Sequence, residues 1–255
     1  VGAYRSQGAT LNQAGGTFGS GTDYATTAAG YTKVVMADMN GDLKLDVVAS
    51  GEYPGSVTVL AGRGDGTLEW TAEYTAMPRP RTLAVADVNA DSVPDVITGS
   101  WQDGYVGVRL GRGDGTLWHH VEYWAGGSVS AVAVADFNLD GKPDIAADNA
   151  SDSHVAVLPG LGGGRFEAPR QLTPTSANPT AVASGDLNGD QYVDLVTLDK
   201  SSRVVSVVLG AAGGAFTLGS QYPVAFNAQS LRLADFNGDG KADLLVTNDY
   251  QTVTV

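Results

Sequence analysis

A repeat of about 49 residues constrains the fold of this chain more than any other feature. Five acidic segments begin with an aspartate, and successive aspartates are 49, 49, 50 and 49 residues apart: Asp38, Asp87, Asp136, Asp186 and Asp235. A glycine-rich turn keeps nearly the same spacing and ends at Phe18, Leu68, Leu117, Phe166 and Phe216. Two independent markers with one period indicate a repeat protein.

Each period contains four short segments with an alternating apolar pattern and no helical stripe. In the second period these segments cover residues 81–88, 95–100, 104–111 and 117–125, separated by Gly, Asp and Asn turns. Four short strands per 40–50 residues are typical of a blade of a β-propeller. The sequence therefore predicts an all-β fold, a single β-propeller domain over residues 1–255 with five four-stranded blades.

The ends of the chain predict how the ring closes. The 20 residues after Asp235 and the 38 residues up to Asp38 together exceed one period by nine. Residues 251–255 resemble a third strand, whereas residues 1–6 and the segment after them resemble a third and a fourth strand. We expect a composite last blade, built from both termini, that pairs otherwise exposed edges. A five-blade part of a larger ring, or an open unit whose terminal strand completes a neighbouring molecule, is the less favoured alternative.

Composition excludes several classes of function. The formal net charge of −13 argues against nucleic acid or an anionic membrane as the main partner, because both require a basic surface. Without cysteine, the chain can form neither disulfides nor thiolate zinc sites. No apolar run approaches the roughly 18–20 residues of a membrane span. The opening "VGAYRSQGAT" lacks the order of a signal peptide, so an exported protein would appear here in a mature form.

The acidic segments share the pattern D-x-N-x-D-x-x-x-D, as in "DFNGDGKAD" at 235–243. This pattern resembles the calcium loop of the FG-GAP/VCBS repeat family, the propeller repeats of integrin α-subunit heads and of some lectins. The resemblance extends over essentially the whole chain. It is closest in the third and fifth loops, where Gly141 and Gly240 occupy the sixth position. Leu43, Ser92 and Gln191 replace that glycine elsewhere, and we expect them to strain the backbone.

The residues themselves support calcium, because Ca²⁺ takes six to eight hard oxygen ligands and a tight loop can direct several toward one point. We expect up to five structural Ca²⁺ ions, each held by four side chains and by the backbone carbonyl of the seventh loop residue. The predicted sets are Asp38, Asn40, Asp42, Lys44 and Asp46; Asp87, Asn89, Asp91, Val93 and Asp95; Asp136, Asn138, Asp140, Lys142 and Asp144; Asp186, Asn188, Asp190, Tyr192 and Asp194; Asp235, Asn237, Asp239, Lys241 and Asp243.

The alternative is that these loops are metal-free Asx turns, since Asp and Asn stabilise tight turns unaided. Three carboxylates per loop would then repel one another. Five bound Ca²⁺ would change the formal net charge from −13 to −3, which favours the calcium interpretation.

Other motifs carry weaker signals. The tripeptide Arg-Gly-Asp occurs twice, in "GRGDGT" at 62–67 and 111–116, but both copies occupy the recurrent turn of the repeat. His119, His120 and Glu122 lie on a predicted outer strand, where surface decoration is a simpler explanation than catalysis. No nucleophile elbow or phosphate loop is present in the sequence. We therefore expect a protein that is not an enzyme.

The loops between second and third strands vary while the blades repeat, so we expect recognition there. Aromatic rings and carboxylates suited to a sugar ring are Tyr53, Trp101, Asp103, Tyr105 and Tyr250. The sequence thus predicts a secreted or cell-surface, calcium-stabilised recognition module whose partner is a glycan or an extracellular protein, with glycan favoured. We expect neither nucleic-acid binding nor membrane insertion. The alternatives are a structural subunit of a surface layer or filament that self-assembles through its terminal strands, and an ancillary domain of a polysaccharide-degrading enzyme.

Overall fold

The computed structural model describes residues 5–9, 12–13, 17–18, 21–172, 178–248 and 253–254. Within these ranges the chain is built from antiparallel β-strands and one short 3-10 turn, η1 (Ala212–Gly214). None of the helical structure in the described residues is long and apolar enough to cross a membrane.

Four sheets contain four antiparallel strands each, as the alternating pattern predicts. Blade 1 comprises β5 (Ala29–Ala37), β6 (Asp46–Tyr53), β7 (Ser56–Gly62) and β8 (Leu68–Thr75). Blade 2 comprises β9 (Pro80–Ala86), β10 (Asp95–Ser100), β11 (Tyr105–Arg109) and β12 (Val121–Trp124). Blade 3 comprises β13 (Val132–Ala135), β14 (Asp144–Asn149), β15 (His154–Leu158) and β18 (Arg170–Leu172), with a small hairpin of β16 (Gly160–Gly162) and β17 (Arg165–Phe166) before the last strand. Blade 4 comprises β19 (Pro179–Gly185), β20 (Asp194–Asp199), β21 (Val204–Ala211) and β22 (Ala215–Pro223).

The two ends of the chain form incomplete sheets. Blade 5 has three described strands, β23 (Ala228–Ala234), β24 (Asp243–Asn248) and β25 (Val253–Thr254). At the other end β1 (Arg5–Ala9) pairs with β4 (Thr22–Thr26), and β2 (Asn12–Gln13) pairs with β3 (Thr17–Phe18). The hairpin of β1 and β4 is held against blade 1, because the Leu68 N–H donates to the Tyr24 hydroxyl at 2.9 Å.

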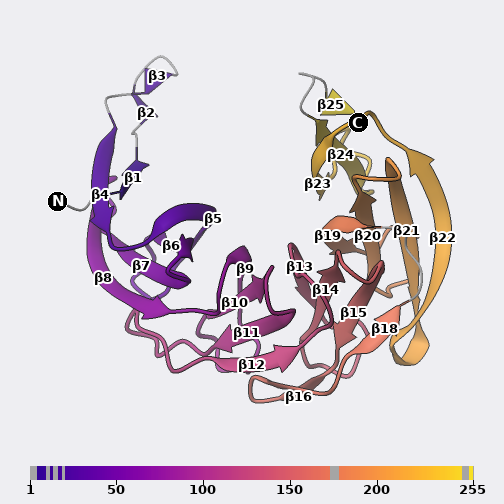
Figure 1. The fold of residues 1–255 in the computed structure, drawn as a ribbon, viewed down its shortest axis with the longest axis horizontal. Helices are drawn as coiled ribbons and strands as arrows, with labels where there is room; N and C mark the ends of the chain where they lie inside the picture. Colours follow the sequence, from indigo (N-terminus) through magenta and orange to yellow (C-terminus); the bar gives the residue numbers. More distant parts are fainter. Residues whose placement is uncertain are drawn as a thin grey trace.

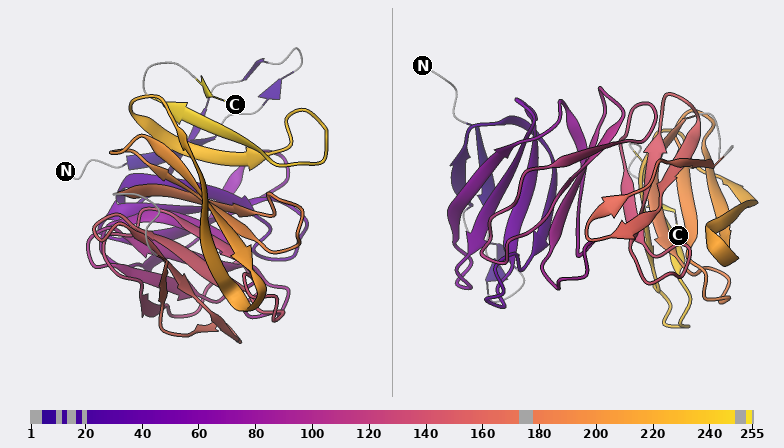
Figure 2. Two further views of the ribbon diagram at one scale, coloured as in Figure 1. Left: turned by 90° about the vertical axis from the view of Figure 1, so that its right-hand side faces the viewer. Right: turned by 90° about the horizontal axis from the view of Figure 1, so that it is seen from below.

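The sheets stand side by side around an open arc, with the N-terminal hairpin at one end and blade 5 at the other (Figures 1 and 2). Among the described strands, β25 pairs only with β24 and β1 only with β4. Both halves of the predicted composite blade are therefore present but lie apart, and the structure does not show the predicted closed ring. The reason is physical: counting strands gives the number of blades, whereas the angle at which blades pack against one another sets the curvature.

The core consists of four apolar layers, one between each pair of successive blades. The second strand of a blade lies between two neighbours, so every residue of β10, β14 and β20 is buried. The fourth strands form the outer edge and are largely exposed in β12 and β22. Stacking thus buries faces that no blade could bury alone.

One repeat position shows how the layers are sealed. The second residue of the acidic loop is at most 1% exposed in the first three blades, where it is Met39, Val88 and Phe137. Each packs in the same apolar layer as the last residue of the glycine-rich turn in the next blade, respectively Leu117, Phe166 and Phe216. In blade 4 the equivalent Leu187 is half-buried and lines a cavity of about 530 Å³ beside blade 5. In blade 5 the equivalent Phe236 is 51% exposed.

Candidate calcium loops and recognition rim

The acidic loops connect the first and second strands of each blade, as predicted, and the last aspartate of each loop anchors it. Asp46, Asp95, Asp144 and Asp194 are at most 1% exposed. In each of these four, one carboxylate oxygen accepts the N–H of the second loop residue at 2.8–2.9 Å. The other oxygen accepts the N–H of the glycine 16 residues further on at 2.6–2.8 Å. This aspartate therefore ties the loop to the end of the third strand.

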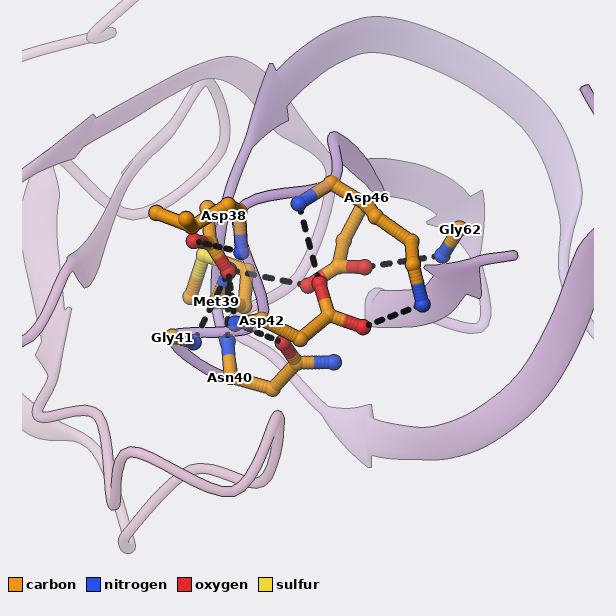
Figure 3. Close-up of polar contacts among 9 residues, drawn as sticks. Asp38, Met39, Asn40, Gly41, Asp42, Asp46 and Gly62 are labelled. Atoms are coloured by element: carbon orange, nitrogen blue, oxygen red, sulfur yellow. Dashed lines mark hydrogen bonds and ion pairs between the residues drawn. The ribbon is translucent and has the colours of Figure 1, made fainter. Parts of the chain in front are cut away.

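The remaining polar side chains of a loop bind its own backbone (Figure 3). Asp38 Oδ1 accepts the N–H of Gly41 at 2.8 Å, and Asp38 Oδ2 accepts the N–H of Leu43 at 2.8 Å. Asn40 Oδ1 accepts the N–H of Asp42 at 2.9 Å, and Asp42 Oδ1 accepts the N–H of Lys44 at 3.0 Å. The last two contacts recur in all five loops. Each loop is thus a chain of Asx turns.

The carboxylates of a loop also act on one another through their charges. Burial raises the pKa of Asp95 to about 6, backbone N–H donors oppose this, and the charges of Asp91 and Asp87 raise it further. Burial raises the pKa of Asp144 in the same way, and the charges of Asp140 and Asp136 add to it. A cation placed among these oxygens would remove this repulsion.

The loops fit calcium in the chemistry of their donor atoms but not yet in the placement of those atoms. The side-chain donors are all oxygens and include three carboxylates per loop, which is the chemistry Ca²⁺ selects. Within the described part of the chain, however, no three acidic or histidine side chains converge as a group that could hold a metal ion. The donor chemistry therefore fits calcium, and binding would bring the carboxylates of a loop closer together around a shared ion.

The sixth loop position has a left-handed backbone in every copy, a conformation that glycine adopts without strain. Gly141 and Gly240 both have φ of 81°. Leu43, Ser92 and Gln191 have φ of 64°, 67° and 76°, a region that costs a residue with a Cβ roughly 1–2 kcal/mol. The expected backbone strain in the first, second and fourth loops is confirmed.

The opposite end of the blades carries the variable loops between second and third strands, where two predicted ligand residues are accompanied by arginines. The Arg79 guanidinium lies over the Tyr53 ring, with 5.2 Å from Cζ to the centroid, and Arg81 lies over the Trp101 ring, also at 5.2 Å. Both arginines face Glu52 Oε1, at 3.6 Å and 3.7 Å respectively. We refer to these five residues as the arginine rim.

Neither the two arginines nor Glu52 was predicted from the sequence. A signal was available: the repeat position of Arg79 is otherwise Gly30, Ser128, Asn178 and Asn227, and that of Arg81 is Thr32, Ser130, Thr180 and Gln229. Arginine thus stands where every other blade carries a small or uncharged residue.

The other predicted ligand residues are placed less closely together. Asp103 is exposed in the turn after β10, with its N–H donating to Ser100 Oγ at 3.1 Å. Tyr105 is half-buried at the start of β11. Tyr250 lies outside the described residues. The structure therefore supports Tyr53 and Trp101 as neighbours on one rim and leaves the rest as separate predictions.

Both Arg-Gly-Asp copies lie in the predicted turns, and their aspartates are engaged locally. Asp65 Oδ1 accepts the Thr67 N–H at 2.8 Å and the Thr67 hydroxyl at 2.6 Å, and these bonds hold the Asp65 pKa below its usual value. The Asp114 carboxylate is bound in the same way by Thr116. The motif is thus explained by turn formation.

The histidine pair lies before β12. His120 Nε2 is 2.9 Å from Glu122 Oε1, and His120 Nδ1 is 3.0 Å from a nitrogen of the buried Arg109 guanidinium. This arrangement anchors the outer edge of blade 2 to the arginine.

Comparison with known proteins identifies the repeats. The FG-GAP-like repeat matches residues 38–98, 87–147 and 186–246. No curated protein sequence matches the chain.

Several solved structures share the fold. A Photorhabdus luminescens Tc holotoxin pore structure is 22% identical with a TM-score of 0.52 and covers 97% of this chain. An Agrocybe aegerita lectin specific for non-reducing terminal N-acetylglucosamine is 18% identical with a TM-score of 0.58 and covers 84%. BBS1N, in complex with ARL6DN, is 10% identical with a TM-score of 0.59 and covers 87%. The chain spans only 12%, 60% and 64% of these three proteins, respectively.

Proposed function

The chain belongs to the FG-GAP-like repeat family, and we propose that it is a secreted, calcium-stabilised recognition module without catalytic activity that binds glycans. The observation that carries the glycan proposal is the arginine rim, where Tyr53 is 48% exposed and Trp101 stands beside it with charged groups between them. An exposed ring, with a half-buried ring and hydrogen-bonding groups beside it, suits a sugar ring. A lectin among the proteins of similar fold supports the same interpretation.

Calcium is the proposed structural ion of the acidic loops. Bound Ca²⁺ supplies positive charge and a fixed coordination shell. In the first loop Asp38, Asn40, Asp42, Asp46 and the Lys44 carbonyl would hold it, and the equivalent residues would do so in the other four loops. What supports the proposal is the all-oxygen donor set and the mutual effect of the carboxylates on the pKa of Asp95 and Asp144.

The calcium proposal is tested by thermal unfolding. EDTA should lower the melting temperature, and excess Ca²⁺ should restore it, whereas excess Mg²⁺ should not, because Mg²⁺ retains its waters and prefers an octahedral shell. Isothermal titration of the EDTA-treated protein with Ca²⁺ gives the number of sites. A melting temperature that is the same in EDTA and in Ca²⁺ would leave the loops as Asx turns only.

The glycan proposal is tested on a glycan array in buffer with Ca²⁺ and in buffer with EDTA. Binding to defined sugars, reduced by EDTA, is the expected result. Turnover of a polysaccharide in the same samples would instead support the enzyme alternative. An array without any binding would refute glycan recognition.

A structural role in an assembly is the second candidate, and exposed apolar side chains at both ends of the arc favour it. Val34 and Met36 in β5 are 57% and 64% exposed, and Phe236 before β24 is 51% exposed. Their blade 2 and blade 3 equivalents Leu83, Val85 and Phe137 pack within apolar layers. Concentration-dependent polymerisation, lost in Met36→Ser with Phe236→Ser, would support this role.

A further inference from the structure

The arginine rim is an unusual concentration of positive charge in a chain of net charge −13. Arg79 and Arg81 converge on the single carboxylate of Glu52, so the three charged groups sum to +1. The Glu52 side chain is 16% exposed, while those of Arg79 and Arg81 are 41% and 45% exposed. The arginine heads are therefore accessible, and the acid that pairs with them lies beneath.

The N–H donors of both guanidinium groups remain available for hydrogen bonding. Each carries five N–H donors, and neither donates a side-chain hydrogen bond within the described residues. The contacts to Glu52, at 3.6 Å and 3.7 Å, are longer than a charge-assisted hydrogen bond of about 2.7–2.9 Å. A second carboxylate could thus bind the two arginines without displacing an existing hydrogen bond.

The arginines are held in place before any ligand arrives. Stacking over the Tyr53 and Trp101 rings restricts rotation of the arginine side chains. The backbone N–H of Trp101 donates to the backbone carbonyl of Arg79 at 3.1 Å. Arg79 has φ of 51°, where the equivalent positions of the first and last blades have Gly30 and Asn227, at φ of 69° and 57°. Arginine in a left-handed position is strained, and such strain concentrates at binding sites.

A small pocket adjoins the rim. It has a volume of about 250 Å³, and its lining includes Glu52, Tyr53, Thr75, Arg79 and Gln102. This volume lies below the roughly 300–1,000 Å³ of sites that enclose drug-sized ligands, which suits one terminal unit of a larger ligand.

We propose that Arg79 and Arg81 bind the carboxylate of an acidic sugar residue, with its ring in the pocket beside Tyr53. This inference rests on the proposed glycan-binding function and specifies its ligand class. Arginine recognises a carboxylate through two parallel N–H donors, which fixes orientation as well as charge. The Gln102 amide and Thr75 offer hydrogen bonds for the sugar hydroxyls.

The test compares ligands that differ at one group. Methyl glycosides of glucuronic acid, galacturonic acid and N-acetylneuraminic acid are titrated against methyl glucoside and methyl galactoside in Ca²⁺ buffer. The readout is the Trp101 indole N–H resonance, assigned with Trp101→Phe. At least one acidic glycoside should shift this signal and bind at least tenfold more tightly than its neutral counterpart. The glycoside of N-acetylneuraminic acid has no neutral counterpart in this set, so it is compared with both neutral glycosides.

Variants assign the effect to the rim. Arg79→Gln and Arg81→Gln should each weaken binding at least tenfold, while Arg81→Lys, which keeps the charge but loses the paired donors, should give a smaller loss. Arg112→Gln is the matched control, because Arg112 also stacks on a tryptophan, with 3.8 Å to the Trp118 centroid, at the other end of the blades. It should bind as the wild type does. Unchanged melting temperatures show that the glutamine variants are folded.

The outcomes separate this inference from the proposed function. Binding of neutral glycosides with equal or greater affinity overturns the acidic-sugar inference and leaves glycan recognition standing. Absence of binding by all five glycosides, together with an empty glycan array, overturns both. A shift of the same size with sodium acetate, or binding unaffected by Arg81→Gln, also overturns the inference, because the sugar or the rim would then not be recognised.

Discussion

Truncating one phenylalanine should measure how much a neighbouring blade contributes to stability. Phe137 in the third acidic loop is fully buried, and its ring meets that of Phe216 edge-on, with centroids 5.8 Å apart. Phe137→Ala removes this contact and leaves a cavity between blades 3 and 4. Substitutions of this kind cost about 3–5 kcal/mol, of which about 0.5–1.5 kcal/mol is the aromatic contact.

The chain provides its own control for this experiment. Phe236 occupies the same repeat position in the fifth loop but is 51% exposed. Half-burial of a phenylalanine is worth about 1 kcal/mol, so Phe236→Ala should cost about that or less. The two substitutions remove identical atoms, and the expected difference of about 3 kcal/mol reports the covering blade alone.

Hydrogen exchange is the suitable assay, because stacked repeats need not unfold as one unit. In Phe137→Ala the amides of β14 and β20 should exchange faster by a factor that corresponds to about 3–5 kcal/mol. In Phe236→Ala the amides of β24 should change little. Equal losses in the two variants would refute the argument that the next blade seals this position.

Further substitutions test three local features. Leu43→Gly should raise the free energy of unfolding in urea by about 0.5–1 kcal/mol. Leu43 is 93% exposed at φ of 64°, and the relief of backbone strain exceeds the conformational entropy that glycine costs. A lower free energy of unfolding in this variant would contradict the prediction. Burial raises the pKa of Asp148 to about 7, so the folded protein keeps a proton that the unfolded chain loses near pH 4. The free energy of unfolding of the wild type should therefore fall by about 3–4 kcal/mol between pH 4 and 7. Asp148→Asn keeps the hydrogen bonds from the Ser130 and Ala131 N–H groups and should lack this fall. Ser56→Ala should leave stability unchanged or raise it by about 1 kcal/mol, since the Ser56 hydroxyl is buried without a hydrogen-bond partner in the described structure. Ser206→Ala is the contrasting variant and should lower stability by about 1 kcal/mol, because the Ser206 hydroxyl accepts a hydrogen bond from Gln221 at 2.9 Å.

The strands and the acidic loops were predictable because their causes are local. Alternation with period two fixes which residues face a neighbouring blade, and the predicted segments of the second period contain β9, β10, β11 and β12 apart from one residue, Pro80. The strained positions were predictable for the same reason. Glycine in two loops indicated a left-handed backbone, and Leu43, Ser92 and Gln191 adopt it too.

The arginine rim could not be predicted from its own segment, since its residues come from two blades. Glu52 and Tyr53 are the last two residues of β6, whereas Arg79 precedes β9 and Arg81 is its second residue. The variable loops themselves contain the aromatic rings, but the cations stacked on these rings come from a different segment. Comparing repeats position by position, with arginine against small or uncharged residues, is the sequence signal that marks the site.

The closed ring was predicted by counting repeats and the residues in each period, but these counts do not determine whether a ring closes. The repeat specifies a local interface, in which Phe216 covers Phe137 and Phe166 covers Val88, and this interface recurs between blades. The number of such interfaces in a full turn depends on the wedge angle of each, which is set by side-chain volume in the apolar layers and by strand twist. An excess of nine residues over one period therefore carries no information on curvature. Along the arc the same loop position changes from fully buried at Phe137, through the cavity at Leu187, to 51% exposed at Phe236. Its environment therefore depends on how completely another blade stacks against it, because blade 5 has only three described strands beside Leu187.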